Sequence, residues 1–218
     1  MEDLAEEFAY VPFERLVQCC LLGPSGAGKT TFLRLIAPTL GHFAELSDSG
    51  LNKVSGVQTV GGTSIAFRIY DVPGRAGVDD AQHAKILRES DAALIVCDIN
   101  DPGSIEEATR CAAQLGRRYP NCTRFLVFNR DDGEFDRQAP AESRLQAISQ
   151  AAGCAYARTS CLERQGIEDA LYSFATHVLY PTQTYMYVGA SQSPDSSSKG
   201  RRRAHHRRKE KDEGCAVL

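Results

Sequence analysis

Eight residues near the start of the sequence have the types and spacing of a phosphate-binding loop. They run from Gly23 to Thr30 (GPSGAGKT) and match G-x-x-x-x-G-K-[ST] at every defined position. Glycine lets the backbone adopt positive φ angles and approach a ligand closely, so several N–H groups can surround a chain of phosphates. Lys29 adds a positive charge, and Thr30 adds a hydroxyl ligand for Mg²⁺. The run therefore predicts a site for a nucleotide with its magnesium ion.

The segments on either side of this loop must hold it in place if the match is functional. Leu16 to Leu22 is an apolar run of strand length, and Thr31 to Ile36 has apolar residues at helical spacing. A helix that starts at the loop directs the positive end of its dipole toward the phosphates. This context favours a phosphate loop over a glycine-rich turn that binds nothing.

Two later segments carry polar groups at the ends of apolar runs. Asp71 can hold Mg²⁺ through water, and Gly74 lets a backbone N–H turn toward a γ-phosphate. Asn129 and Asp132 follow another apolar run, where a carboxylate can accept hydrogen bonds from the N1–H and 2-amino group of guanine. Adenine lacks both donors, and a site built for them penalises the base without them. The sequence predicts GTP in preference to ATP, with a phosphate-loop ATPase or kinase as an alternative of another class.

The other elements alternate in an order that places these groups at one edge of a sheet. Gly61 and Gly62 join two strand-like runs as a two-residue hairpin, and helix and strand patterns alternate after it. Alternation of this kind is typical of a parallel sheet with ligands at the carboxyl ends of its strands. The predicted fold is α/β, a mostly parallel six-stranded sheet with one antiparallel hairpin at its edge and helices on both faces. The expected strands are 16–22, 52–60, 63–70, 92–97, 123–128 and 154–157, and the expected helices are 31–40, 79–88, 106–118, 141–151 and 166–179.

The ordered set of motifs resembles the Ras superfamily of small GTPases. It consists of Gly23–Thr30, Asp71-x-x-Gly74, Asn129-Arg130-Asp131-Asp132 and Thr159-Ser160-Cys161, and the resemblance covers roughly Leu16 to Leu179. It implies a phosphate-loop NTPase G domain over residues 15–180, after an N-terminal extension over 1–14 and before a flexible basic tail over 181–218. It also implies that GTP or GDP binds with Mg²⁺. The implied partners are effector proteins, an exchange factor and a GTPase-activating protein.

The resemblance further assigns roles to residues of this sequence. The implied Mg²⁺ ligands are Thr30, Asp71 and Ser49, the serine standing where the family usually has threonine, with Ser47 close by as the alternative. The groups implied at the γ-phosphate, and so in catalysis, are Lys29, Gly74 and Arg75. The implied GTP-binding residues are Gly23, Ser25, Gly26, Ala27, Gly28, Lys29, Thr30, Thr31, Asp71, Gly74, Asn129, Arg130, Asp132, Ser160 and Cys161.

Arg75 is the main departure from the family pattern. The family usually has a glutamine there, which orients the attacking water, and a guanidinium cannot accept a hydrogen bond from water. Slow GTP hydrolysis is therefore expected, unless Arg75 acts as an arginine finger or Gln82 or His83 replaces the glutamine. The alternative for the whole protein is a hydrolysis-deficient, mostly GTP-bound binding module that is regulated by abundance or localisation.

Smaller departures lie in the base-binding segments. Arg130 stands where the family usually has lysine, which keeps the charge and changes its shape. Cys161 and Leu162 stand where it usually has alanine and lysine. Weaker packing on the base near Ser160 is the expected result.

Charge distribution and cysteine spacing indicate the kind of cellular compartment in which the protein works. The net charge is −3, but Lys199 to Glu213 contains eight basic and three acidic residues, so this segment carries +5 and the rest of the chain −8. The eight cysteines include no C-x-x-C pair, which favours reduced thiols in the cytosol without a disulfide framework or zinc site. The N-terminus is acidic and is not expected to be a signal peptide.

The C-terminal segment combines two membrane-directed features. A linker from Gly189 to Ser198 precedes the basic run from Lys199 to Lys209. The last four residues, starting at Cys215, fit C-a-a-X with a final leucine, the geranylgeranyl type. A basic run alone is equally compatible with a nucleic-acid patch, but with a prenyl group it forms a two-signal anchor for an anionic membrane. The expected location is the cytoplasmic face of the plasma membrane, with Cys215 lipidated and no nucleic-acid partner.

Overall fold

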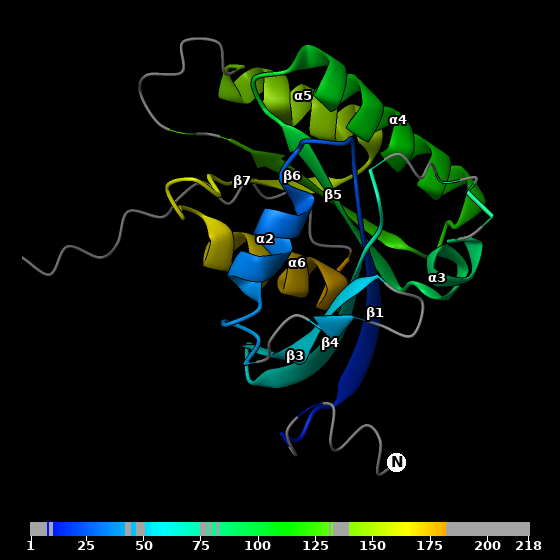
Figure 1. The fold of residues 1–218 in the computed structure, drawn as a ribbon, viewed down its shortest axis with the longest axis vertical. Coiled ribbons are helices and arrows are strands. Elements are labelled where there is room, and N and C mark those ends of the chain that lie inside the picture. Colours follow the sequence, from blue (N-terminus) through cyan, green and yellow to red (C-terminus); the bar gives the residue numbers. More distant parts are fainter. Residues whose placement is uncertain are drawn as a thin grey trace, which may run out of the picture.

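The computed structural model describes residues 8, 11–41, 45–46, 51–74, 78, 80–81, 83–130, 132 and 140–181. Its strands are β1 (Arg15–Leu22), β2 (Glu45–Leu46), β3 (Asn52–Val60), β4 (Thr63–Asp71), β5 (Ala92–Asp98), β6 (Thr123–Asn129) and β7 (Ala155–Arg158). Its helices are α2 (Lys29–Ile36), α3 (Ala84–Glu89), α4 (Pro102–Arg118), α5 (Glu142–Ala152) and α6 (Ile167–Leu179). Figure 1 shows one sheet with helices packed on its two faces.

The strands form one sheet in the order β2-β3-β4-β1-β5-β6-β7. β3 pairs antiparallel with β2 and with β4, and the remaining neighbours are parallel. This confirms the mostly parallel α/β sheet with an antiparallel hairpin at its edge. The two-residue strand β2 is an addition, because that segment was expected to be loop. Gly61 and Gly62 form the hairpin turn with φ angles of 58° and 89°, the positive values that a two-residue turn of this kind requires.

The sheet divides the core into two compartments. On one side Leu94 and Val96 of β5 pack with α2 and α6; on the other, Ile95 and Cys97 pack with α3, α4 and α5. Successive residues of a strand point to opposite faces, and a strand covered by helices on both faces is apolar throughout. The expected helical cover of both faces is therefore confirmed (Figure 1).

Helix boundaries differ from the expected ones in ways that the local chemistry explains. α4 begins at Pro102 and not at residue 106, because the Asp101 side chain accepts a hydrogen bond from the Gly103 N–H at 2.9 Å and Pro102 is suited to a first helical turn. α2 ends at Ile36 and not at residue 40, since Pro38 lacks an N–H, and turns follow to Gly41. α3 is shorter than expected at its start, and residues 79 and 82 lie outside the described part.

The seven cysteines in the described part of the chain are free thiols, and five of them are buried. Burial raises the pKa of Cys111 and of Cys122 to about 12, and that of Cys154 to about 11. These thiols are neutral at pH 7 and pack as small apolar groups. Within the described ranges, no helix has the length and apolar composition that crossing a bilayer requires.

The register of the central strands brings the predicted polar residues to one edge of the sheet. Leu21 of β1 lies opposite Asp71 of β4, and Asp98 of β5 lies opposite Asn129 of β6. The phosphate loop begins directly after β1, at the same edge. The fold thus places the carboxyl ends of β1, β4, β5 and β6 around one site.

Candidate functional site: a nucleotide pocket

The phosphate loop joins β1 to α2; positive φ angles favour glycine at three of its positions, and lack of space also requires glycine at two of them. Gly23, Gly26 and Gly28 have φ angles of 129°, 84° and 91°. A Cβ atom on Gly23 would lie 2.0 Å from the carbonyl oxygen of Val96, and one on Gly28 would lie 2.4 Å from Nδ2 of Asn129. A side chain at either position would displace the backbone of the loop, so the loop shape depends on these two glycines.

Lys29 bends back over the loop that precedes it. Its Nζ donates to the carbonyl oxygens of Gly23 and Pro24, each at 2.8 Å, and the residue is 7% exposed. Burial lowers the pKa of this ammonium, while the nearby Asp71 carboxylate acts in the opposite direction. The Lys29 ammonium leaves no room for a side chain at Gly74, because a Cβ atom there would lie 2.6 Å from Lys29 Nζ. The cation and the glycine of the Asp71-x-x-Gly74 segment are therefore in close contact.

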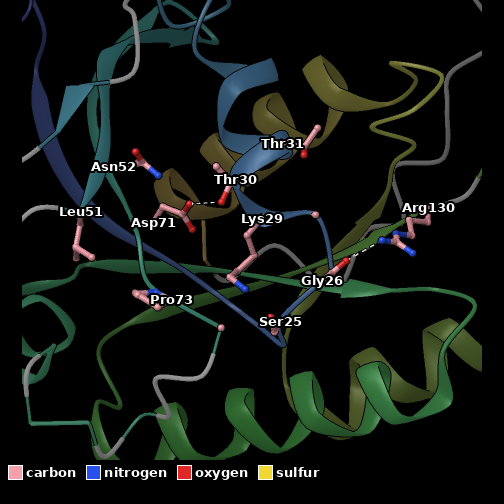
Figure 2. A pocket seen from close by; sticks show the side chains of 12 residues that line it. Ser25, Gly26, Lys29, Thr30, Thr31, Leu51, Asn52, Asp71, Pro73 and Arg130 are labelled. Atoms are coloured by element: carbon pink, nitrogen blue, oxygen red, sulfur yellow. Dashed lines mark hydrogen bonds between the residues drawn. The ribbon is translucent and has the colours of Figure 1, made fainter.

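Thr30 and Asp71 meet at the start of α2. The Thr30 hydroxyl donates to Asp71 Oδ2 at 2.5 Å, across 41 residues of sequence (Figure 2). Asp71 is 7% exposed. Two oxygen groups from separate elements, one of them a buried carboxylate, form the kind of donor set that Mg²⁺ prefers, with water and phosphate oxygens completing its shell. These residues fit a magnesium ion.

A cavity of about 560 Å³ lies beside these groups, a size suited to a small-molecule ligand. Figure 2 shows Lys29, Thr30 and Asp71 facing it, with Pro73 from the end of β4 and Arg130 from the end of β6. The full lining is Ser25, Gly26, Gly28, Lys29, Thr30, Thr31, Leu51, Asn52, Asp71, Pro73, Gly74 and Arg130. Leu51 and Asn52 were not predicted from the sequence, since neither belongs to a recognisable motif.

Asn129 ties three segments together from a buried position. Its Nδ2 donates to the carbonyl oxygen of Ala27 at 2.9 Å. Its Oδ1 accepts from the Thr159 hydroxyl at 3.3 Å and from the backbone N–H of Cys161 at 3.1 Å. The residue is 1% exposed, so each of these bonds satisfies a group that water cannot reach. Asn129 thus connects the phosphate loop to the segment after β7.

Asp132 is held by Ser160 from that same segment. The Ser160 hydroxyl donates to Asp132 Oδ1 at 2.5 Å and accepts from the Glu163 N–H at 2.9 Å. The contact directs one carboxylate oxygen and leaves acceptor capacity on the other. Burial raises the pKa of the neighbouring Cys161 thiol to about 11, so the thiol is neutral at pH 7.

Arg130 occupies a left-handed backbone conformation, with φ of 66°, directly after β6. Its Nη2 donates to the carbonyl oxygen of Gly26 at 2.9 Å, and its Nη1 lies 3.0 Å from Asp98 Oδ2. Asp98 was not among the residues that the sequence singled out. An aspartate at the end of a strand gives no local indication of a partner 32 positions later.

The structure therefore brings most of the expected site residues together, in two groups. Thr31, Asp71, Gly74 and Arg130 line the cavity, together with five residues of the phosphate loop, Ser25, Gly26, Gly28, Lys29 and Thr30. The predicted loop residues Gly23 and Ala27 are not part of this lining. Asn129, Asp132, Ser160 and Cys161, from the ends of β6 and β7, form an adjoining group that we call the base-side segment. His83 is described, and its Nδ1 lies 3.5 Å from Asp80 Oδ1, but it does not line the cavity. Arg75, Ser49, Gln82 and Cys215 lie outside the described residues.

A glycine loop between a parallel strand and a helix, with a buried lysine and a threonine–carboxylate pair, defines a phosphate-loop nucleotide-binding protein. The family model of the Ras family matches residues 18–180, and the chain belongs to that family of small GTPases. Its members are GTPases that switch between GTP- and GDP-bound forms with Mg²⁺ and generally interact with exchange factors, activating proteins and effectors. A search of curated proteins finds no match to this sequence.

Proposed function

We propose that this chain is a membrane-anchored GTP switch that hydrolyses GTP slowly. The observation that carries the proposal is the connection through Asn129, which joins the segment holding Asp132 to the loop that ends in Lys29 and Thr30. A site of this kind can bind the base and the phosphates of one nucleotide at the same time. The proposed division of the chain is an extension over 1–14, the G domain over 15–180 and a tail over 181–218.

Each group in the site has a task under this proposal. Asp132, oriented by Ser160, accepts hydrogen bonds from guanine. The N–H groups of the phosphate loop and the Lys29 ammonium bind the phosphates. Thr30, Asp71 and Ser49 would hold Mg²⁺, which would supply positive charge beside the phosphates.

Arg75 supports the slow rate. Its position in the sequence, directly after Gly74, is where the family usually has the water-orienting glutamine. Lys29 and Gly74 still stabilise charge at the γ-phosphate, but no hydrogen-bond acceptor at residue 75 orients the water. The same substitution favours a second candidate, a hydrolysis-deficient module that stays GTP-bound and is regulated by its abundance or location.

The tail supports the membrane part of the proposal. Cys215 carries the prenyl group, and the basic run from Lys199 to Lys209 binds anionic lipid. One lipid chain alone gives marginal binding, and each basic residue near the surface adds about 1 kcal/mol. The switch then meets its effectors and regulators at the cytoplasmic face of the plasma membrane.

The test is to load the full chain with Mg-GTP, hold it for several hours, denature it and identify the released nucleotide by chromatography. We expect a mixture in which GDP accumulates slowly. GTP that persists unchanged would support the hydrolysis-deficient module instead. Recovery of no guanine nucleotide, or displacement of GTP by ATP at a similar concentration, would contradict both candidates.

A further inference from the structure

One guanidinium connects three strands of the site. Asp98 ends β5 and Asn129 ends β6, and the parallel register sets these two residues side by side. The residue after Asn129 is Arg130, whose Nη1 lies 3.0 Å from Asp98 Oδ2 and whose Nη2 donates to the Gly26 carbonyl oxygen at 2.9 Å. Arg130 thus links the end of β5 to the phosphate loop that follows β1.

Asp98 is the fixed member of this link. Its Oδ1 accepts from the Asn100 N–H at 2.9 Å, and its own N–H donates to the Ser104 hydroxyl at 2.9 Å. Its side chain is 15% exposed, whereas that of Arg130 is 52% exposed. The carboxylate is therefore held by the turn after β5 and the backbone of Asp98 by α4, and the carboxylate restrains the more exposed guanidinium.

The backbone of Arg130 is restrained from the same segment. Its carbonyl oxygen accepts from Asn100 Nδ2 at 2.9 Å, and the Ile99 N–H donates to the Asn129 carbonyl oxygen at 2.9 Å. A non-glycine residue in the left-handed region persists only where its surroundings fix it. Residues 98–100 provide that fixation at the backbone and at the side-chain end.

Arginine suits this position better than lysine would. A guanidinium presents several N–H donors in a planar fork and can serve a carboxylate and a carbonyl at once, whereas an ammonium is a single point charge on a flexible stem. The lining of the cavity includes both Gly26 and Arg130, so a link between them restrains two walls of the nucleotide site.

We propose that Asp98 is a positioning residue for the nucleotide: through Arg130 it holds the base-side segment against the phosphate loop and sets how long a bound guanine nucleotide stays. This inference rests on the proposed function. It concerns the lifetime of the bound nucleotide, and it makes no claim about hydrolysis.

The test measures dissociation of tritiated GDP from the full chain in Mg²⁺ with excess unlabelled GDP. Asp98→Asn should raise the dissociation rate about threefold to tenfold, the scale of one charge-assisted hydrogen bond at a partly exposed site. Arg130→Lys should raise it similarly, since lysine cannot span both acceptors. The double variant should dissociate no faster than the faster single variant, because both changes break one link.

Two further measurements separate this role from general stability. Raising KCl from about 50 to 500 mM should accelerate GDP release from the wild type and have little effect on Asp98→Asn, because salt screens the ion pair. The control is Asp91→Asn, the same charge change at the other end of β5, where the Asp91 carboxylate accepts from the Gln18 N–H at 2.9 Å. It should release GDP at the wild-type rate.

Four results would overturn the inference. Asp98→Asn could release GDP at the wild-type rate, Asp91→Asn could accelerate release equally, the two site variants could multiply their effects, or salt could act equally on wild type and Asp98→Asn. If Asp98→Asn does not fold, Arg130→Lys decides alone by its rate and salt response. A wild-type chain that retains no GDP would overturn the proposed function, and this inference with it.

Discussion

The side-chain amide of Asn129 donates to the carbonyl oxygen of Ala27 at 2.9 Å, although 102 residues separate them. One bond of this kind makes the end of β6 and the phosphate loop a single structural unit. The other side of the same amide accepts from Cys161 N–H and Thr159, so the unit extends to the segment after β7. The predictions below start from this unit and from the residues around it.

Asn129→Ala should weaken both the fold and nucleotide binding. It leaves the buried Ala27 carbonyl and the half-buried Cys161 N–H without these partners, and such groups cost about 1–3 kcal/mol each when water cannot reach them. We expect the midpoint of thermal unfolding to fall by at least about 4 °C, because a domain of this size loses about 2–4 °C per kcal/mol, and GDP affinity to fall with it. Asn121→Ala, at an exposed turn, is the matched control. An unchanged melting temperature for Asn129→Ala would show that the amide does not hold the segments together.

Thr30→Ala should reduce the dependence of nucleotide binding on Mg²⁺. The variant removes one of the two oxygen groups that meet at 2.5 Å near the cavity, so the ion contributes less to retention of GDP. The measurement is the ratio of GDP dissociation rates in EDTA and in Mg²⁺, which should drop at least about fivefold. Thr109→Ala, which removes a hydroxyl bonded to the Ile105 carbonyl on α4, is the control. A wild-type ratio for Thr30→Ala would argue against Thr30 as a magnesium ligand.

The buried thiols should make the fold less stable in alkaline solution. The pKa of Cys122 is raised to about 12 and that of Cys154 to about 11, whereas an unfolded thiol ionises near pH 8.5. The protonated thiols stabilise the fold fully below about pH 8.5. This stabilisation is lost as the pH rises through the pKa of the folded state, because each thiol loses its proton at a lower pH in the unfolded chain. Denaturant unfolding from pH 7 to 10.5 should show this loss. Cys154→Ala should reduce the fall of the unfolding free energy with pH by up to about 1.4 kcal/mol per pH unit. The same pH dependence in the variant and the wild type would contradict a raised pKa for Cys154.

Cys215→Ser should move the protein from the membrane fraction to the cytosol. Serine cannot accept a prenyl group through a thioether, and the basic run alone binds anionic lipid reversibly. Fractionation of cells that express the full chain measures the change, and retention of GTP loading shows that the G domain is intact. Membrane fractionation that does not change would rule out lipidation of Cys215 as the anchor.

Local patterns were sufficient to predict the phosphate loop and the presence of every described helix and of every described strand except β2, although several helix bounds differ. Apolar runs such as Leu16–Leu22 and the glycine spacing of the loop depend on neighbouring residues alone, and the structure confirms the mostly parallel sheet. The tie from Asn129 to Ala27 and the ion pair of Arg130 with Asp98 depend on strand register, which no local pattern specifies. The short strand β2 was missed because a two-residue segment has no periodicity to detect. The roles of Arg75, Ser49 and Cys215 stay predictions.

The alignment of the central strand β5 depends on two aspartates, Asp91 directly before the strand and Asp98 at its end. Residues 92–97 are apolar toward both faces, so sliding the strand by one residue would leave it equally hydrophobic. Such a slide would move Asp98 about 3.3 Å along the sheet and away from Arg130, and would pull Asp91 from the Gln18 N–H. The two aspartates therefore fix the register of β5, which its apolar middle does not determine. A substitution of Asp98 should therefore accelerate the release of nucleotide before it measurably lowers the stability of the fold.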